Sequence, residues 1–357
     1  MSDLVTAADG RSVRLGLNLT VQYGAAQDPA RAVRDCAALV AAARDAGWAS
    51  VFVSQHYLGG DTAHLHPVPL LASLIGTTGA MELGVGVSLL ALGNPVDLAE
   101  AYGTIDVLSG GRLVLGVGLG YRDVELEAFG VTRAARSARL TTNLDCLTRL
   151  WTGESVSLTT DWCTLRDERL ALLPLQRPRP PVWVAGNADA AVARAARLGD
   201  AWLINPHSRI STIQQQQVLY RRERQRAGLP PAARTPLMRE VVCAPTTSVA
   251  VSRASRHLAR KYATYTAWGQ DAVQPPGDGF SSPFDELAHD RFVVGDPDHC
   301  RAVLQDWVDR TAATDLILRV HWAGQPVDEA LESLELISTT VAPFLTPTRE
   351  SDEHVGP

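Results

Sequence analysis

A histidine at the end of an apolar segment is the first group in this sequence that could move protons at neutral pH. His56 closes the segment "ASVFVSQH" and lies between two polar neighbours, Gln55 and Tyr57. A histidine side chain titrates close to neutral pH, so its ring can take or give a proton during a reaction. The residues leave two interpretations open: a general acid or base, and a hydrogen-bonded structural residue.

Alternate glycines close a second apolar segment, "RLVLGVGLGYR". The run consists of Gly116, Gly118 and Gly120, followed at once by Tyr121 and Arg122. Glycine weakens a strand interior because it has no side chain to pack, so something must need the room. One interpretation is a shelf on which a flat ring lies against the backbone, with an anion or a polar edge near the arginine. The other is relief of crowding at a corner of a barrel. A phosphate loop is disfavoured because the final glycine of that pattern is missing.

A third apolar segment, "PPVWVAG", leads into Gly186, Asn187 and Ala188 just before a segment of helical period. Free backbone N–H groups and the dipole at a helix start favour a phosphate. Asn187 could equally be an ordinary helix cap. The segment is therefore a candidate anion site with that alternative open.

Three further histidines are weaker candidates. His64 and His66 have the His-x-His spacing of some metal sites, but they lie in a loop, without the further ligands on later strands that such sites use. We interpret them as a solvated loop and predict no metal site. His321 follows the apolar segment 314–322 and is either a site residue or a packed core histidine.

The bulk composition excludes several classes of function. The net charge is −6, so no basic field exists to attract nucleic acid or an anionic membrane. Lys261 is the one lysine, which argues against Schiff-base chemistry. The five cysteines form no Cys-x-x-Cys pair and suggest neither a disulfide framework nor a thiolate metal site. With no export signal or long apolar run, we expect a cytoplasmic protein.

The candidate residues named above lie at the ends of short apolar segments, which alternate along the chain with segments of helical period. The pattern predicts parallel strands with crossover helices. The predicted strands cover residues 13–21, 49–56, 82–90, 112–120, 180–186, 200–205, 237–245 and 314–322. This number of strands, each with a following helix, favours a (β/α)8 TIM barrel with insertions. A doubly wound sheet would need a glycine fingerprint after the first strand, and none is there.

In a TIM barrel the active site lies at the carboxyl ends of the strands. The candidate residues follow the ends of the predicted strands, so we expect them on that one face. We predict one barrel domain over residues 1–347 and a C-terminal tail over 348–357. Insertions are expected near 152–178, which is β-rich, and near 266–290. A continuous helix is expected from about 124 to 151.

Together these segments resemble the bacterial-luciferase-like family of flavin-dependent monooxygenases and oxidoreductases. The resemblance covers nearly the whole chain and is most specific over residues 82–131. That stretch carries Asn-Pro, Ser-Gly-Gly-Arg, Gly-Val-Gly-x-Gly-Tyr-Arg and Glu-x-x-x-Phe-Gly in order. The resemblance implies a luciferase-like barrel that binds reduced FMN at its mouth. The flavin would react with O2 at C4a, and the resulting peroxyflavin would oxygenate a small organic substrate.

The resemblance also implies roles for individual residues. His56 matches the catalytic histidine of the family, and Gln55 beside it stands where the luciferase has a glutamate. We take both as candidate catalytic residues, but a neutral amide cannot act as a base, so light emission is not expected. The positions expected to bind the flavin are Gly86, Val87 and Ser88 at a strand bulge that often has a non-proline cis peptide, Gly118, Gly120, Tyr121 and Arg122 beside the ring, and Gly186, Asn187 and Ala188 at the phosphate.

The Pro/Gly-rich segment 268–290 falls where the family carries a mobile lid. A lid that orders over bound ligand would keep water from the reacting flavin. A passive surface insertion is the alternative. The candidate substrate contacts are Tyr57, Trp268, Phe280, Phe284 and His321.

The expected partners follow from the same resemblance. We expect a separate NAD(P)H–flavin reductase to supply the reduced FMN, because the sequence shows no second nucleotide-binding domain, and we expect a homodimer. Two other functions stay open. One is hydride transfer that depends on the deazaflavin F420 and consumes no O2, and the other is flavin binding without turnover.

Overall fold

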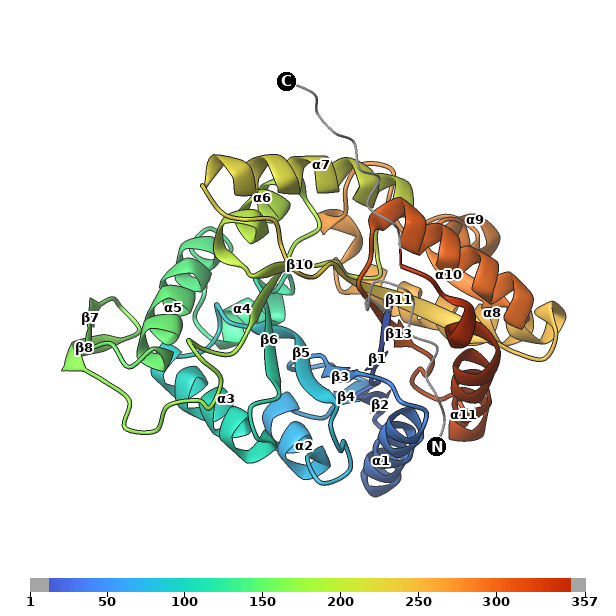
Figure 1. Ribbon diagram of the computed structural model, residues 1–357, viewed down its shortest axis with the longest axis horizontal. Helices are drawn as coiled ribbons and strands as arrows, with labels where there is room; N and C mark the ends of the chain where they lie inside the picture. The colour runs from blue at the N-terminus through green and yellow to red at the C-terminus, as the bar shows by residue number, and fades with distance from the viewer. Residues whose placement is uncertain (1–12, 348–357) are drawn as a thin grey trace.

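The apolar segments of the sequence become the parallel strands of a closed barrel. The computed structural model describes residues 13–347 (Figure 1). The barrel strands are β1 (Arg14–Asn18), β3 (Ser50–Val53), β5 (Glu82–Leu89), β6 (Leu113–Gly118), β9 (Val182–Ala185), β10 (Ala201–Leu203), β11 (Pro236–Cys243) and β13 (Asp315–Arg319). They are hydrogen-bonded in the order β10-β9-β6-β5-β3-β1-β13-β11. A parallel bridge between Ile204 and Leu237 joins β10 to β11 and closes the ring. The predicted (β/α)8 barrel is therefore confirmed.

Helices surround the barrel as an outer layer (Figure 1). The longer ones are α1 (Pro29–Asp45), α2 (Pro67–Leu74), α3 (Pro95–Ser109), α5 (Arg136–Trp151), α6 (Asp189–Leu198), α7 (Ile210–Arg226), α8 (Thr247–Ala267), α10 (Pro297–Thr311) and α11 (Val327–Leu336). Local chemistry explains their ends. Asp28 accepts hydrogen bonds from the first turn of α1, and Gly110, with φ 72°, ends α3 in the left-handed conformation.

One predicted helix is in fact two. The sequence predicted a continuous helix over residues 124–151, whereas the structure has α4 (Asp123–Ala128) and then α5. Gly130, with φ 64°, allows the chain to turn after α4. After this break α4 has its own direction, and its Glu125 contacts His56.

Smaller elements decorate the barrel. The strands β7 (Val156–Thr159) and β8 (Thr164–Glu168) form an antiparallel hairpin that projects beyond the helical layer near α5 (Figure 1). β2 (Gln22–Gly24) pairs with β4 (Thr62–His64), and β12 (Phe292–Gly295) extends the sheet beside β11. The segment after α8 holds a 3-10 turn (Asp271–Val273) and α9 (Phe284–Ala288), and the chain after α11 winds through a π-helical turn (Ile337–Val341) and a 3-10 turn (Ala342–Phe344). The tail predicted over 348–357 lies outside the described residues.

The barrel interior is apolar at one level and polar at the next. The buried side chains that meet inside the barrel are Phe52, Val114, Trp183, Ala201, Leu203, Met238 and Ile317. Their strands lie all round the ring, so these side chains meet near its axis. Phe52 stacks on Trp183 with ring centroids 5.4 Å apart. Two residues further along their strands, Glu240 and Arg319 continue the interior towards the carboxyl ends, where polar groups are normal for an active site.

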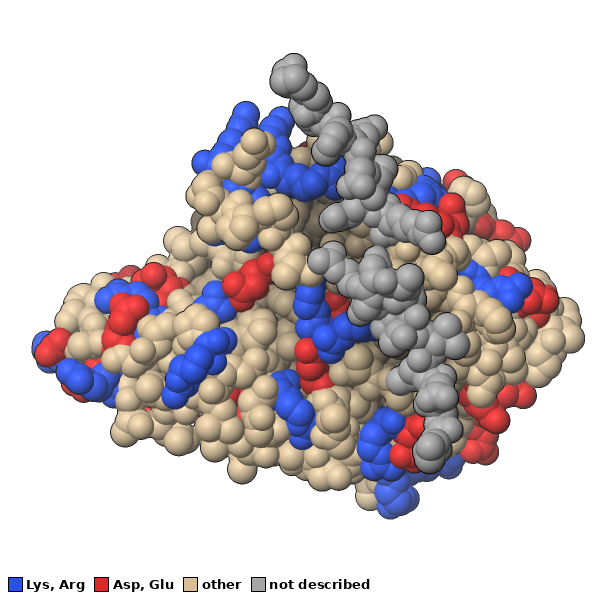
Figure 2. Space-filling view, in the orientation of Figure 1, with Lys and Arg blue, Asp and Glu red and all other residues tan. Residues whose placement is uncertain are grey.

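The surface is mixed in charge. Figure 2 shows Arg side chains interspersed with Asp and Glu over the visible face; the one lysine, Lys261, is buried. All five cysteines are buried free thiols. Within residues 13–347, every helix is too short or too polar to cross a membrane.

Candidate active site at the carboxyl end of the barrel

A cavity of about 390 Å³ opens where the barrel strands end. This volume is in the range of small-molecule sites, roughly 300–1,000 Å³. One wall consists of small residues contributed by β5, β6, β9 and the start of α6, namely Gly86, Gly118, Gly120, Ala185, Gly186, Ala188 and Ala191. The polar and aromatic lining includes Asn18, His56, Tyr121, Asn205, His207, Lys261, Tyr265 and Arg319.

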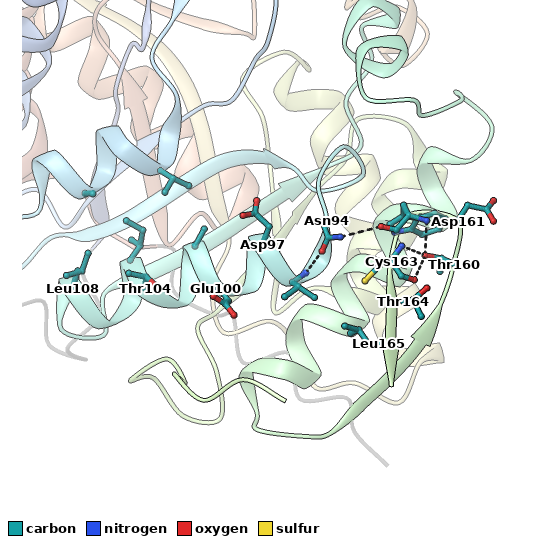
Figure 3. Close-up of a pocket in the computed structure, with 16 residues that line it drawn as sticks. Asn94, Asp97, Glu100, Thr104, Leu108, Thr160, Asp161, Cys163, Thr164 and Leu165 are labelled. Atoms are coloured by element: carbon teal, nitrogen blue, oxygen red, sulfur yellow. Dashed lines mark hydrogen bonds between the residues drawn. The ribbon is translucent and has the colours of Figure 1, made fainter. Parts of the chain in front are cut away.

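A larger depression of about 970 Å³ lies outside the barrel, between α3 and the turn of the β7–β8 hairpin (Figure 3). Asn94 reaches across it and donates a hydrogen bond to the carbonyl of Trp162 at 3.3 Å. It is shallow and has no histidine, lysine or arginine in its lining. The strand-end cavity is therefore the candidate active site.

The wall of small residues is built by a close approach of β5 to β6. The pairing of these strands shifts register between Val85 and Ser88, and the Gly86–Val87 peptide bond is cis, the feature expected from the resemblance. A Cβ on Gly116 would collide with the carbonyl oxygen of Val85, so this glycine relieves crowding and lies outside the cavity lining. A Cβ on Gly118 would lie 2.7 Å from Val87 Cγ2. Gly118 therefore permits the close approach of the two strands, as the crowding interpretation expects, and a flat ring lying against this wall stays a prediction.

His56 is held by a carboxylate that the sequence interpretation did not single out. Glu125 of α4 is buried, and its Oε1 accepts hydrogen bonds from His56 Nδ1 at 3.0 Å, from the Tyr57 amide at 2.9 Å and from Arg122 Nη1 at 3.1 Å. Burial alone would raise the pKa of Glu125, but the bond and charge of His56, the Tyr57 amide and Arg122 lower it below its usual value. An ionised carboxylate accepts only, so Nδ1 carries the proton and Nε2 is left to exchange one. The Glu-x-x-x-Phe-Gly pattern was the signal available for Glu125.

Arg122 does not lie where the sequence placed it. Its guanidinium donates to the carbonyls of Tyr57 at 2.5 Å and Leu58 at 2.9 Å and lies 4.2 Å below the ring of Trp268. It is not part of the cavity lining. Arg122 thus fixes the loop after β3, because its donors are taken up by that backbone rather than left for a ligand.

Gln55 is also committed to the scaffold, although it lines the cavity. Its Oε1 accepts from the Leu89 amide at 2.7 Å, and its Nε2 donates to the hydroxyl of Tyr57 at 2.7 Å. Ser88 is buried behind the lining with its Oγ 3.5 Å from Gln55 Oε1. Through these hydrogen bonds both residues connect the loop after β3 to the end of β5.

None of the five candidate substrate residues belongs to the lining of the strand-end cavity, and among them only Trp268 makes a ring contact with His56. Trp268 stacks on Tyr265 and lies 5.5 Å from the His56 ring. Tyr57 packs against Phe129 instead. Phe280 lies behind His207, Phe284 packs on Phe292, and His321 opens onto a different cavity beside Gln325. These residues lie outside the barrel strands, where the residue type does not determine the direction of a side chain. This explains why they do not lie where they were expected. The segment 270–274 does reach the cavity, through Gln270, Ala272, Val273 and Gln274.

The α6 end of the cavity is a cationic site. Ala188 precedes α6, and no side chain caps the helix; Asn187 pairs with the side chain of Asn205 instead, which rules out the ordinary cap. Arg136 and Arg194 line the same end. Burial and neighbouring arginines lower the pKa of both, and Arg194 Nε is buried without a partner. Uncapped amides beside an incompletely paired guanidinium suit a phosphate.

His64 lies beside the active-site histidine, with ring centroids 5.4 Å apart. Its Nδ1 donates to the Thr62 carbonyl at 3.0 Å, and its Nε2 is buried without a partner. Burial and the charge of His56 lower the pKa of His64 to about 4. Within residues 13–347, His64 and His66 belong to no cluster of three ligand-type side chains that could hold a metal ion.

We expect this neutral His64 to make folding sensitive to acid. Its pKa is lower in the folded than in the unfolded chain, so only the unfolded chain binds the proton as the pH falls below 6.5. Stability from this residue is full above that pH, and at most about 2 kcal/mol of it is lost at pH 5. The free energy of unfolding of His64→Gln, measured at pH 7.5 and pH 5, should fall less than that of the wild type. An equal fall in both proteins would contradict the prediction.

Comparison with known proteins places the chain among relatives of this architecture. A family model described as luciferase-like monooxygenase matches residues 13–314. Among curated proteins, 4-hydroxyprotoasukamycin monooxygenase of Streptomyces nodosus subsp. asukaensis is 33% identical over 140 residues, which cover 39% of this chain and 38% of the relative. The chain matches about half the length of other curated relatives.

Two solved structures share the fold. The oxygenating constituent of 3,6-diketocamphane monooxygenase from Pseudomonas putida, in complex with FMN, has a TM-score of 0.77 at 19% identity, over 94% of this chain and 99% of that one. An F420-dependent secondary alcohol dehydrogenase in complex with an F420–acetone adduct has a TM-score of 0.76 at 13% identity, over 93% and 99%. At these identities the likeness shows the fold alone.

Proposed function

The chain belongs to the luciferase-like monooxygenase family, and from that premise we propose that it is a flavin-dependent monooxygenase that uses reduced FMN and O2 to oxygenate a small organic substrate. The observation that carries the proposal is the composition of one cavity. A wall of small residues, a histidine held by a buried carboxylate and a cationic end all line the same space.

The residues present fit FMN. Arg136, Arg194 and the uncapped start of α6 would hold its phosphate, and the wall around Gly86 and Gly118 would hold its flat ring. Bound there, a reduced flavin supplies the electrons that activate O2. His56 would give or take a proton at Nε2, while Trp268 and the segment 270–274 would keep water out of the site.

F420-dependent hydride transfer remains the second candidate, for one specific reason. Two arginines, Arg136 and Arg194, line the α6 end. Arg133 and Arg197 add to the positive field there, although each of them is paired with a carboxylate. A longer anionic tail would also suit this field. Flavin binding without turnover is disfavoured by the intact His56–Glu125 pair.

A binding and reoxidation experiment separates these functions. Calorimetry first gives the affinities of the purified protein for FMN and F420. Photoreduced FMN is then mixed with protein and O2, and the return of the oxidised-flavin spectrum is followed. A delayed return that quickens with substrate, with one atom of labelled O2 in the product, supports the proposal. Tight F420 binding without O2 use supports hydride transfer, and bound but unreactive FMN supports a non-catalytic role.

The cationic end yields a prediction about the phosphate. Arg194→Gln should weaken FMN binding by about 10- to 100-fold, because it removes a charge-assisted hydrogen bond of ~1.5–3 kcal/mol. Riboflavin, which lacks the phosphate, should bind both proteins alike. Arg197→Gln, on the same helix but paired with Glu223, is the matched control. Equal losses for FMN and riboflavin would remove Arg194 from the phosphate site.

The expected partners complete the proposal. We propose that a separate NAD(P)H–flavin reductase delivers the reduced FMN to a cytoplasmic homodimer. Light scattering on the eluting protein measures the oligomeric state. Turnover that any flavin reductase supports, without contact between the two proteins, would show that delivery is by diffusion.

A further inference from the structure

A second group of charges lines the cavity, formed by β11, β13 and α8. In the closed ring of eight strands, β11 lies four strands from β5, and β13 lies four strands from β6. These elements therefore lie across the barrel from the wall of small residues. Glu240 and Arg319 occupy the polar level of the barrel interior, and Lys261 reaches down from α8. Lys261 and Arg319 both line the cavity.

The one carboxylate of this group is already satisfied. Glu240 is fully buried, and its Oε1 pairs with Lys261 Nζ. Its Oε2 accepts a hydrogen bond from Trp322 Nε1 at 2.7 Å. Both carboxylate oxygens of Glu240 therefore have a partner, and its charge is paired with that of Lys261.

Arg319 is the second cation, and it has almost no partner. The residue is 4% exposed, and its Nη2 donates to Asn18 Oδ1 at 3.2 Å. Its Nε is buried without a hydrogen bond, and within residues 13–347 it forms no ion pair with any carboxylate. A buried guanidinium without a counter-charge is strongly unfavourable, and sites that keep one commonly use it to bind an anion.

The surroundings add positive rather than negative charge. His207 lines the same cavity, and its pKa is held well below the usual value by burial, then by Lys261, Arg291 and Arg319. His207 therefore stays neutral and does not supply a negative charge to balance Arg319. The pKa of Lys261 is lowered, first by burial and also by the positive charge of Arg319. The group carries one uncompensated positive charge that faces the cavity.

We propose that Arg319, supported by Lys261, binds an anionic oxygen of the substrate, so that the substrate is a small organic acid such as a carboxylate or an ionised phenol. Bound this way, the acid lies opposite the wall of small residues and beside Tyr265. The inference rests on the proposed function only in naming the bound acid as the substrate. The binding site itself is independent of it.

Matched neutral and anionic probes test the site directly. Benzoate and benzamide have the same shape, and we expect the protein to bind benzoate about 10- to 100-fold more tightly at pH 7.5 by calorimetry. Arg319→Gln should reduce this preference to near unity, and Arg319→Lys, which keeps the charge, should retain part of it. Arg197→Gln, which changes an arginine outside the cavity lining that is paired with Glu223, should leave it unchanged.

Saturation with FMN distinguishes the outcomes. Benzoate binding that persists beside FMN supports the inference, and binding that FMN abolishes assigns benzoate to the phosphate end and overturns it. Equal affinity of the wild type for both probes also overturns it, as does a preference that survives in Arg319→Gln. Weaker FMN binding in Arg319→Gln with an unchanged benzoate preference would assign the charge to the flavin ring. Failure to bind any flavin, with the benzoate preference intact, would overturn only the proposed function.

Discussion

Replacement of His56 with alanine should slow product formation by roughly 10²- to 10⁴-fold, the range for loss of a positioned proton-transfer group. FMN affinity should change little, because the side chains proposed to hold the phosphate lie at the α6 end of the cavity. The rate is measured in single turnovers with reduced FMN and the best substrate from a panel of ketones and aromatic acids.

The controls for this variant use its neighbours. His66→Ala removes a histidine that contacts Tyr57 but does not line the cavity, and it should retain most of the rate. Added imidazole should partly restore His56→Ala, because the vacated space admits a free ring. An unchanged rate in His56→Ala would exclude the imidazole from the mechanism.

Glu125→Gln should lower the same rate by about 10- to 100-fold, which corresponds to ~1.5–3 kcal/mol for a hydrogen bond to a charged group. Glutamine keeps an oxygen that can accept from His56, Tyr57 and Arg122, but it loses the charge that stabilises a protonated ring. The amide also places donors where the buried Oε2 now has no partner. The variant therefore tests the charge more than the shape.

A spectroscopic readout separates positioning from general damage. Nitrogen-15 NMR of the histidines should show His56 protonated on Nδ1 in the wild type and a mixture of tautomers in Glu125→Gln. Glu127→Gln changes an exposed residue of the same helix and should alter neither the rate nor the tautomer. A normal rate with an unchanged spectrum in Glu125→Gln would remove this carboxylate from the proton-transfer machinery.

Much of the framework was predictable because strands and helices leave local signals. The segments 49–56 and 82–90 read as buried strands and became β3 and β5. Asp28 and Pro29 predicted the start of α1, because Asp28 accepts hydrogen bonds from the first turn and proline favours the first helical position. The break between α4 and α5 was missed because one left-handed glycine, Gly130, outweighed a long run of helix-forming residues. α10 was not assigned, although its buried residues recur at helical spacing, at positions 300, 304, 307, 308 and 311.

The candidate site divides in the same way. Parallel strands place their carboxyl ends on one face, so the ends of the apolar segments correctly brought His56, Gly118 and Gly186 to one cavity. Tyr57, Arg122 and Phe280 were expected there and point elsewhere. Their direction is set by what they pack against, and that information lies in distant parts of the chain.

The sequence by itself determined the barrel, the family and the strand ends at which chemistry could occur, because hydrophobic period, glycine placement and motif order are local properties. Only the tertiary structure decided which charges meet. His56 and Glu125 are 69 positions apart, and Asn18 meets Arg319 across 301 positions. Such pairs form only when the ring of strands closes and brings the two residues together. Burial at low dielectric then strengthens the interaction between them.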